Sequence, residues 1–118
     1  MHSRMEEKET EAEDGMLRWI AGAMGFELHH ESEYSKLGGA GIFESDRWWF
    51  MSRPFPRGYT GEPGPGWRMT RSFYTQGKLL SNILKSETAF LDNGEVLRNP
   101  FYGMSRDEIA LRMAVAGA

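Results

Sequence analysis

The sequence predicts a small α+β domain in which one small antiparallel sheet is packed by about three helices. Apolar residues recur at helical spacing in three segments, aromatic or alternating segments typical of strands lie between them, and an Asp-Asn-Gly turn separates two short apolar runs. The length of 118 residues fits one domain, since domains commonly run to about 100–150 residues. We expect this domain to span residues 15–118, behind a tail of residues 1–14.

The tail is strongly acidic. Residues 1–14 hold six Asp and Glu residues and few large apolar side chains. Burial of so little apolar surface does not offset the entropy lost on ordering, so we expect a mobile segment. The first helix is expected near residues 15–24, with Asp14 as its N-cap and Gly25 just beyond its end. Gly22, inside this helix, indicates a close packing contact.

Strand signals occupy the middle of the chain. Residues 29–41 are polar and then glycine-rich, which is typical of a flexible connection. Aromatic and alternating patterns then predict strands near residues 42–52 and 67–74, which we expect to pair. Residues 54–66 between them contain many prolines and glycines, and a surface loop of this length is often functional.

The last third contains three further elements. A second helix is expected near residues 76–86, and a hairpin over residues 89–98 follows from the Asn-Gly turn. The last helix is expected near residues 105–116. It begins at a capping box, in which Ser105 caps the helix and Glu108 reaches back to the cap.

Charge is unevenly distributed along the chain. The net charge of −3 combines an acidic first part, with four Lys and Arg against eleven Asp and Glu in residues 1–46, and a basic remainder, with ten against six. Residues 47–85 hold seven Lys and Arg but only one acidic residue, Glu62. This basic window predicts a partner-binding surface.

Several classes of protein do not fit. The chain has no cysteine, which excludes disulfides and thiolate metal sites and favours a reducing compartment, with the cytoplasm as the expected location. The N-terminus lacks the apolar region of a secretory signal. No apolar run approaches the roughly 18–20 residues that cross a bilayer, so we expect no membrane association.

Catalytic and metal-binding patterns are weak. His29, His30, Glu31 and Glu33 have the composition of a metal site, but adjacent side chains point in different directions, so the two histidines cannot readily share one ion. No serine lies in the setting of an activated nucleophile, and the glycine-rich segments lack the order of phosphate-binding loops. We expect no catalytic residue, no metal and no cofactor.

The basic window also contains many aromatic rings. Arginine and aromatic side chains are enriched in hot spots of protein interfaces, and the same mixture suits single-stranded nucleic acid; burial in the core is the alternative for some of the rings. Arg53, Arg57 and Tyr59 are the expected anchors, because they flank or lie in the long loop. The predicted binding residues are Arg47, Trp48, Trp49, Arg53, Arg57, Tyr59, Arg68, Arg71 and Lys78.

These features favour a non-enzymatic protein-interaction module with another protein as its partner. Such a module is either a small subunit of a larger assembly or a phage-type inhibitor of host machinery. The alternative is a nucleic-acid-binding accessory protein that uses the same window. The overall negative charge disfavours that alternative, since dedicated nucleic-acid binders are usually basic.

Overall fold

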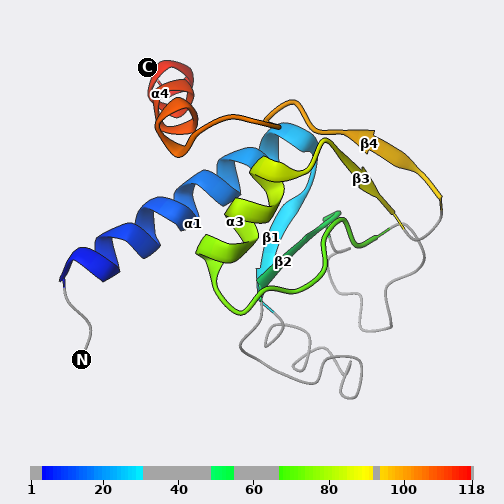
Figure 1. Ribbon diagram of the computed structural model, residues 1–118, viewed down its shortest axis with the longest axis horizontal. Coiled ribbons are helices and arrows are strands. Elements are labelled where there is room, and N and C mark those ends of the chain that lie inside the picture. The colour runs from blue at the N-terminus through cyan, green and yellow to red at the C-terminus, as the bar shows by residue number, and fades with distance from the viewer. Residues whose placement is uncertain (1–3, 31–48, 55–66, 92–93, 118) are drawn as a thin grey trace.

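Three helices and two small antiparallel sheets make up the part of the protein that the structure describes, an α+β arrangement as predicted (Figure 1). This computed structural model describes residues 4–30, 49–54, 67–91 and 94–117. The elements in chain order are α1 (Arg4–Met24), β1 (Glu27–His30), β2 (Trp49–Ser52), α3 (Gln76–Lys85), β3 (Thr88–Phe90), β4 (Val96–Arg98) and α4 (Arg106–Ala116).

Helix α1 begins much earlier than the sequence analysis predicts. It starts at Arg4 rather than near residue 15. The added turns are rich in Glu, with Lys and Ala, which are good helix formers, and extending an existing helix adds one hydrogen bond for each residue fixed. Composition therefore allows the helix to continue through a segment with little apolar surface to bury.

Helix α1 ends where the sequence indicates. Gly25 has a φ of 79°, its N–H donates to the carbonyl of Gly22 at 3.3 Å, and the N–H of Phe26 donates to the carbonyl of Ala21 at 2.7 Å. These are the two bonds of a Schellman motif. The described residues show no packing contact at Gly22, because a Cβ placed there would meet none of their atoms outside its own helix within 4 Å.

Strand β1 corrects the expectation of a flexible connection beginning at His29. It pairs antiparallel with β2, with Leu28 opposite Met51 and His29 opposite Phe50. The His29 side chain is buried, with its ring centroid 5.6 Å from that of Phe50 and 5.7 Å from that of Trp67. His29 is buried between aromatic rings and packs as an aromatic strand residue would. Because histidine is polar, the sequence did not predict a strand here.

Residues 67–74 lie beside β2 as predicted, but they do not form a regular strand. They make only isolated antiparallel bridges to β2. The N–H groups of Met69 and Thr70 both donate to the carbonyl of Met51, and the Oγ1 of Thr70 accepts from the N–H of Met51 at 2.9 Å. A side chain thus replaces a backbone partner and interrupts the ladder.

The predicted hairpin over residues 89–98 is confirmed as β3 and β4, with Ala89 opposite Leu97. Among the described residues it forms a second sheet, so the strand segments expected in one sheet are divided between two. Residues 67–73 bond along the edge of β2 that β1 leaves open, and β3 and β4 bond to each other.

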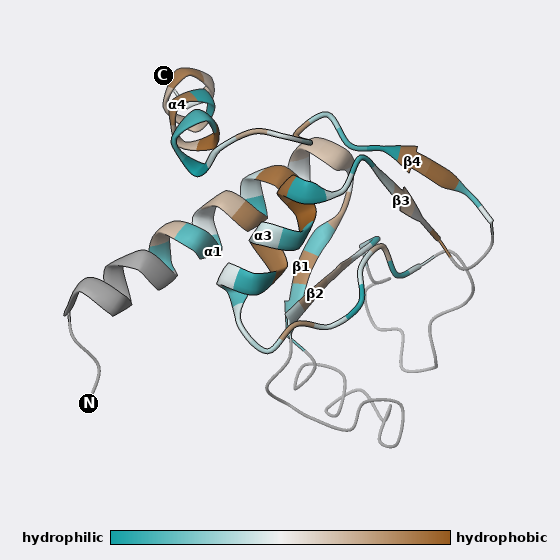
Figure 2. Cartoon of the chain, in the orientation of Figure 1, coloured by the Kyte–Doolittle hydropathy of each residue, from teal (hydrophilic) through white to brown (hydrophobic). Residues whose placement is uncertain are grey.

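The core lies where α1 and α3 pack together over the first sheet (Figures 1 and 2). Helix α4 has one buried residue, Ile109, and begins at the predicted capping box: the Oγ of Ser105 accepts from the N–H of Glu108, whose carboxylate accepts from the N–H of Ser105. The largest fully buried side chains are Phe50, Leu17, Ile20, Met51, Leu79, Leu80 and Ile109.

The described ranges contain no helix that combines the length and the apolar composition of a membrane span. The same ranges contain no group of three side chains suited to hold a metal ion. His29 and His30 face different neighbours, since the ring of His30 lies 4.6 Å from that of Trp49. Glu31 and Glu33 fall outside the described residues.

Candidate functional site

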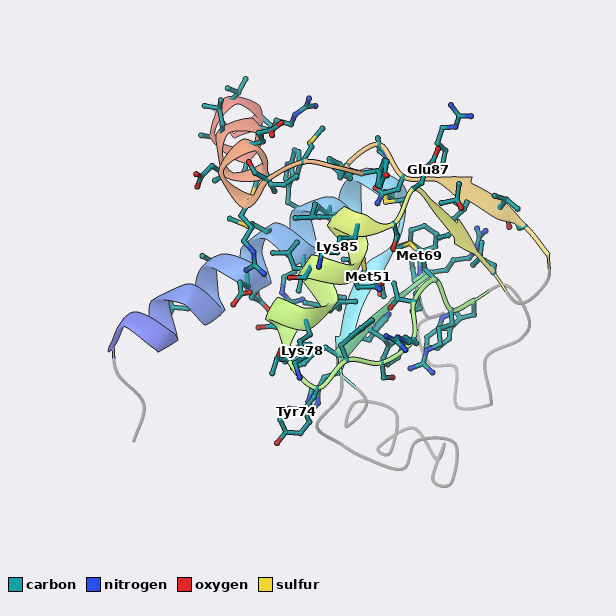
Figure 3. The ribbon with its side chains drawn as sticks, in the orientation of Figure 1. Met51, Met69, Tyr74, Lys78, Lys85 and Glu87 are labelled. Carbon is teal, nitrogen blue, oxygen red and sulfur yellow. The ribbon has the colours of Figure 1, made fainter. Side chains whose placement is uncertain are left out.

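Helix α3 presents two lysines on the side that faces away from the core. Thr75 caps the helix by accepting from the N–H of Lys78 at 3.1 Å. Leu79, Leu80 and Ile83 point inward and are almost completely buried. Lys78 and Lys85, seven residues apart and therefore about two turns from each other, lie on the exposed side (Figure 3).

A groove of about 550 Å³ runs along this side of α3, and we call it the basic groove. Four of the described residues that line it are Lys or Arg, and none is Asp or Glu. Its walls combine α3, the segment that precedes it and the first residue of α4. The described lining residues are Arg71, Phe73, Thr75, Gly77, Lys78, Ser81, Asn82, Lys85 and Arg106.

Three cations of the basic groove have no carboxylate partner in the described part of the chain: Arg71, Lys78 and Lys85. The guanidinium of Arg71 lies 4.8 Å from the ring centroid of Phe73, which holds it at the groove by a cation–π contact. Positive charges gathered in one groove produce a positive electrostatic potential, which attracts an anionic group.

The fourth cation of the groove, Arg106, serves the fold. Its guanidinium pairs with the carboxylate of Glu13, donates to the Oγ of Ser81 at 3.0 Å and donates to the carbonyl of Gly77 at 3.2 Å. One side chain of α4 thereby joins α1 and α3. With its charge already paired, Arg106 forms the wall of the groove more than it attracts a ligand.

Two of the predicted binding residues, Arg71 and Lys78, therefore lie together in the basic groove. Lys85 and Arg106 are not among the residues predicted from the sequence. Lys85 follows Lys78 by seven residues on the side of the helix opposite the apolar stripe, and this spacing was a signal that could have identified Lys85. Arg106 arrives from a distant helix, and no local pattern indicates its place.

Three other predicted residues make contacts within the chain. The guanidinium of Arg53 donates to the carboxylate of Glu95 at 2.6 Å and so links the residue after β2 to the β3–β4 hairpin. The guanidinium of Arg68 lies 4.1 Å from the ring centroid of Phe50. Trp49 is half-buried in β2 and packs against the core. Arg47, Trp48, Arg57 and Tyr59 lie outside the described residues.

No protein-family model, curated protein or solved structure matches this chain.

Proposed function

We propose that the protein is a non-enzymatic binding module whose basic groove takes an acidic segment of a partner protein. The observation that carries this proposal is that Arg71, Lys78 and Lys85 line one groove whose described lining contains no carboxylate. A partner that supplies carboxylates would complete these ion pairs. Such a module suits a small subunit of a larger assembly or a phage-type inhibitor of host machinery, acting in the cytoplasm.

The groove also offers groups that recognise a peptide backbone. Ser81 and Asn82 lie between the two lysines along α3 and line the groove. A hydroxyl and a carboxamide both donate and accept hydrogen bonds, as the amides of an extended peptide require. Charge attracts the segment, and these neutral groups can fix its register.

The described part of the groove favours a protein over a nucleic acid. Its aromatic ring, Phe73, is only 9% exposed, and the guanidinium of Arg71 lies against it. A ring covered in this way offers no platform for a base, whereas stacking is what single-strand binders use. The net charge of −3 further opposes the approach of a phosphate chain.

The test compares two labelled probes, a glutamate-rich peptide and a single-stranded DNA oligonucleotide, by fluorescence anisotropy at several salt concentrations. The groove variant carries Lys78→Glu and Lys85→Glu. The matched control carries Arg98→Glu and Arg112→Glu, which reverse two exposed cations on β4 and α4, outside the groove. Circular dichroism verifies that both variants fold.

We expect the peptide to bind the wild type and the control alike, and to bind the groove variant up to about 30-fold more weakly, since each of the two exposed pairs contributes up to about 1 kcal/mol. Equal peptide binding by the groove variant and the control would refute the groove as the site. If the oligonucleotide binds instead, with a salt dependence that the groove variant reduces by about two phosphate contacts, the partner is a nucleic acid.

A further inference from the structure

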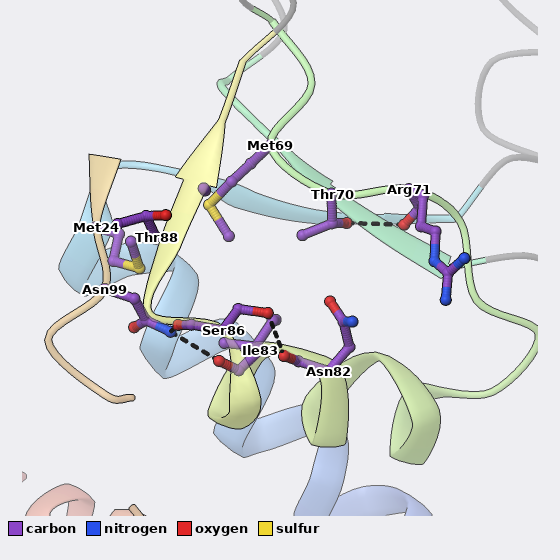
Figure 4. A pocket seen from close by; sticks show the side chains of 10 residues that line it. Met24, Met69, Thr70, Arg71, Asn82, Ile83, Ser86, Thr88 and Asn99 are labelled. Carbon is purple, nitrogen blue, oxygen red and sulfur yellow. Dashed lines mark hydrogen bonds between the residues drawn. The ribbon is translucent and has the colours of Figure 1, made fainter. Parts of the chain in front are cut away.

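A cavity of about 340 Å³ adjoins the basic groove, and Arg71 and Asn82 line both (Figure 4). The volume falls within the range of about 300–1,000 Å³ typical of ligand pockets. In Figure 4, Met24 and Asn99 lie at one end of the cavity and Arg71 at the other. The cavity and the groove are therefore neighbours, with Arg71 and Asn82 between them.

The chemistry of the cavity differs from that of the groove. Met24, Met69, Ile83 and Ala89 supply apolar walls from α1, the segment before α3, α3 itself and β3. Methionine side chains are flexible and polarizable, so two of them allow the cavity to adapt to the shape of an apolar group. The carboxamide of Asn99 is occupied by hydrogen bonds within the chain, so this polar wall is already satisfied.

We infer that the cavity takes one apolar side chain of the same acidic segment that the groove binds, an inference that rests on the proposed function. The ligand is then an extended peptide in which an aliphatic residue, of the size of leucine or methionine, lies beside acidic residues. Arg71 stands between the two sites, where it can pair with the carboxylate nearest the apolar residue. Asn82 lies at the same junction and can bond the peptide backbone.

The lysines indicate how the acidic residues are spaced. Lys78 and Lys85 are seven residues apart on α3, which corresponds to about 10 Å along the helix axis. An extended peptide covers this distance in about three residues. Because side chains of an extended peptide alternate between its two faces, carboxylates two or four positions apart, with the aliphatic side chain at the Arg71 end, would match the two flexible lysines.

The test uses two labelled peptides that differ at one position. Both are glutamate-rich; one contains a single leucine and the other has alanine in its place. We expect the wild type to bind the leucine peptide at least about 10-fold more tightly, because the larger side chain buries about three more carbon atoms. Ala89→Leu, which fills the cavity, should abolish this preference, so that the variant binds the two peptides with similar affinity.

The outcomes separate the inference from the proposed function. If the wild type binds both peptides equally and the groove variant binds neither, the cavity is not an anchor site but the groove still binds acidic peptides. If neither peptide binds the wild type, both proposals fail. A leucine preference that persists in a folded Ala89→Leu variant would place the anchor elsewhere and overturn the inference.

A measurement on the wild type alone tests the inference even if the Ala89→Leu variant does not fold. The methyl signals of Met24 and Met69, labelled with carbon-13, report directly on the cavity walls. The leucine peptide should shift both signals, and the alanine peptide should leave them close to their free positions. Equal responses to the two peptides would contradict the inference whatever the variants show.

Discussion

Asn99 joins the end of helix α3 to the chain that follows β4. Replacing its side chain should lower the free energy of unfolding. The side chain is buried at 8% exposure. Its Nδ2 donates to the carbonyls of Ile83 at 2.7 Å and Ser86 at 2.8 Å, and its Oδ1 accepts from the N–H of Phe101 at 2.9 Å. The carboxamide therefore satisfies three backbone groups, two of them at the end of a helix, where carbonyls have no partner within the helix.

The cost of Asn99→Ala follows from the groups left behind. The carbonyl of Ile83 keeps a second donor, the N–H of Ser86 at 3.1 Å. The carbonyl of Ser86 and the N–H of Phe101 lose the bond that Asn99 provides. A buried polar group without a partner costs about 1–3 kcal/mol, and the partly buried Ser86 carbonyl can recover some of this from water, so we expect a loss of about 2–4 kcal/mol.

Urea unfolding followed by tryptophan fluorescence measures this loss as a change in the free energy of unfolding. Asn82→Ala is the matched control, because that side chain makes no hydrogen bond with the described residues and alanine is the better helix former. Asn99→Asp should also destabilise, since it places a carboxylate oxygen against two carbonyls. A loss below about 1 kcal/mol for Asn99→Ala would refute the reasoning.

Three further substitutions or deletions test the fold by the same unfolding measurement. Ser105→Ala removes the side chain that caps α4 and should destabilise by about 0.5–2 kcal/mol; an unchanged midpoint would mean that the capping box contributes nothing. Gly22→Ala should stabilise by about 0.5–1 kcal/mol, because the added Cβ lies in a helix interior and meets no other described part of the chain, and a loss of stability would contradict this. Deleting residues 1–10 should change the free energy of unfolding by no more than about 0.5 kcal/mol, given their polar composition, and a larger drop would show that they pack.

The elements with local signals were the ones that the sequence predicted well. Helix α4 has its capping box and α3 its apolar stripe, and both lie within one residue of the expected bounds. The strand at residues 67–74 failed for a physical reason. Met69 and Phe73 alternate along this segment and are both buried, but side-chain burial does not determine which backbone groups bond. The Oγ1 of Thr70 accepts from the N–H of Met51 in place of a backbone carbonyl.

The candidate site was less predictable than the fold. The sequence indicated Arg71 and Lys78 through the basic window, yet Arg53 in the same window is paired with Glu95, which lies far along the chain. Which cations of a basic window keep an unpaired charge depends on where the acidic residues fold back. Arg106 shows the same limit, because Glu13 reaches it only through the packing of α1 against α4.

The two parts of the proposed site are held with different rigidity, and this suggests a division of roles in binding. Lys78 and Lys85 are exposed surface side chains, whose charges act at a distance and are screened by salt. The cavity wall formed by Ile83 and Ser86 is fixed by the hydrogen bonds of Asn99. Exposed charges mainly change association rates, whereas buried contacts mainly change dissociation rates. Salt should therefore act on the association of an acidic peptide with the basic groove, and filling the cavity should act on its dissociation.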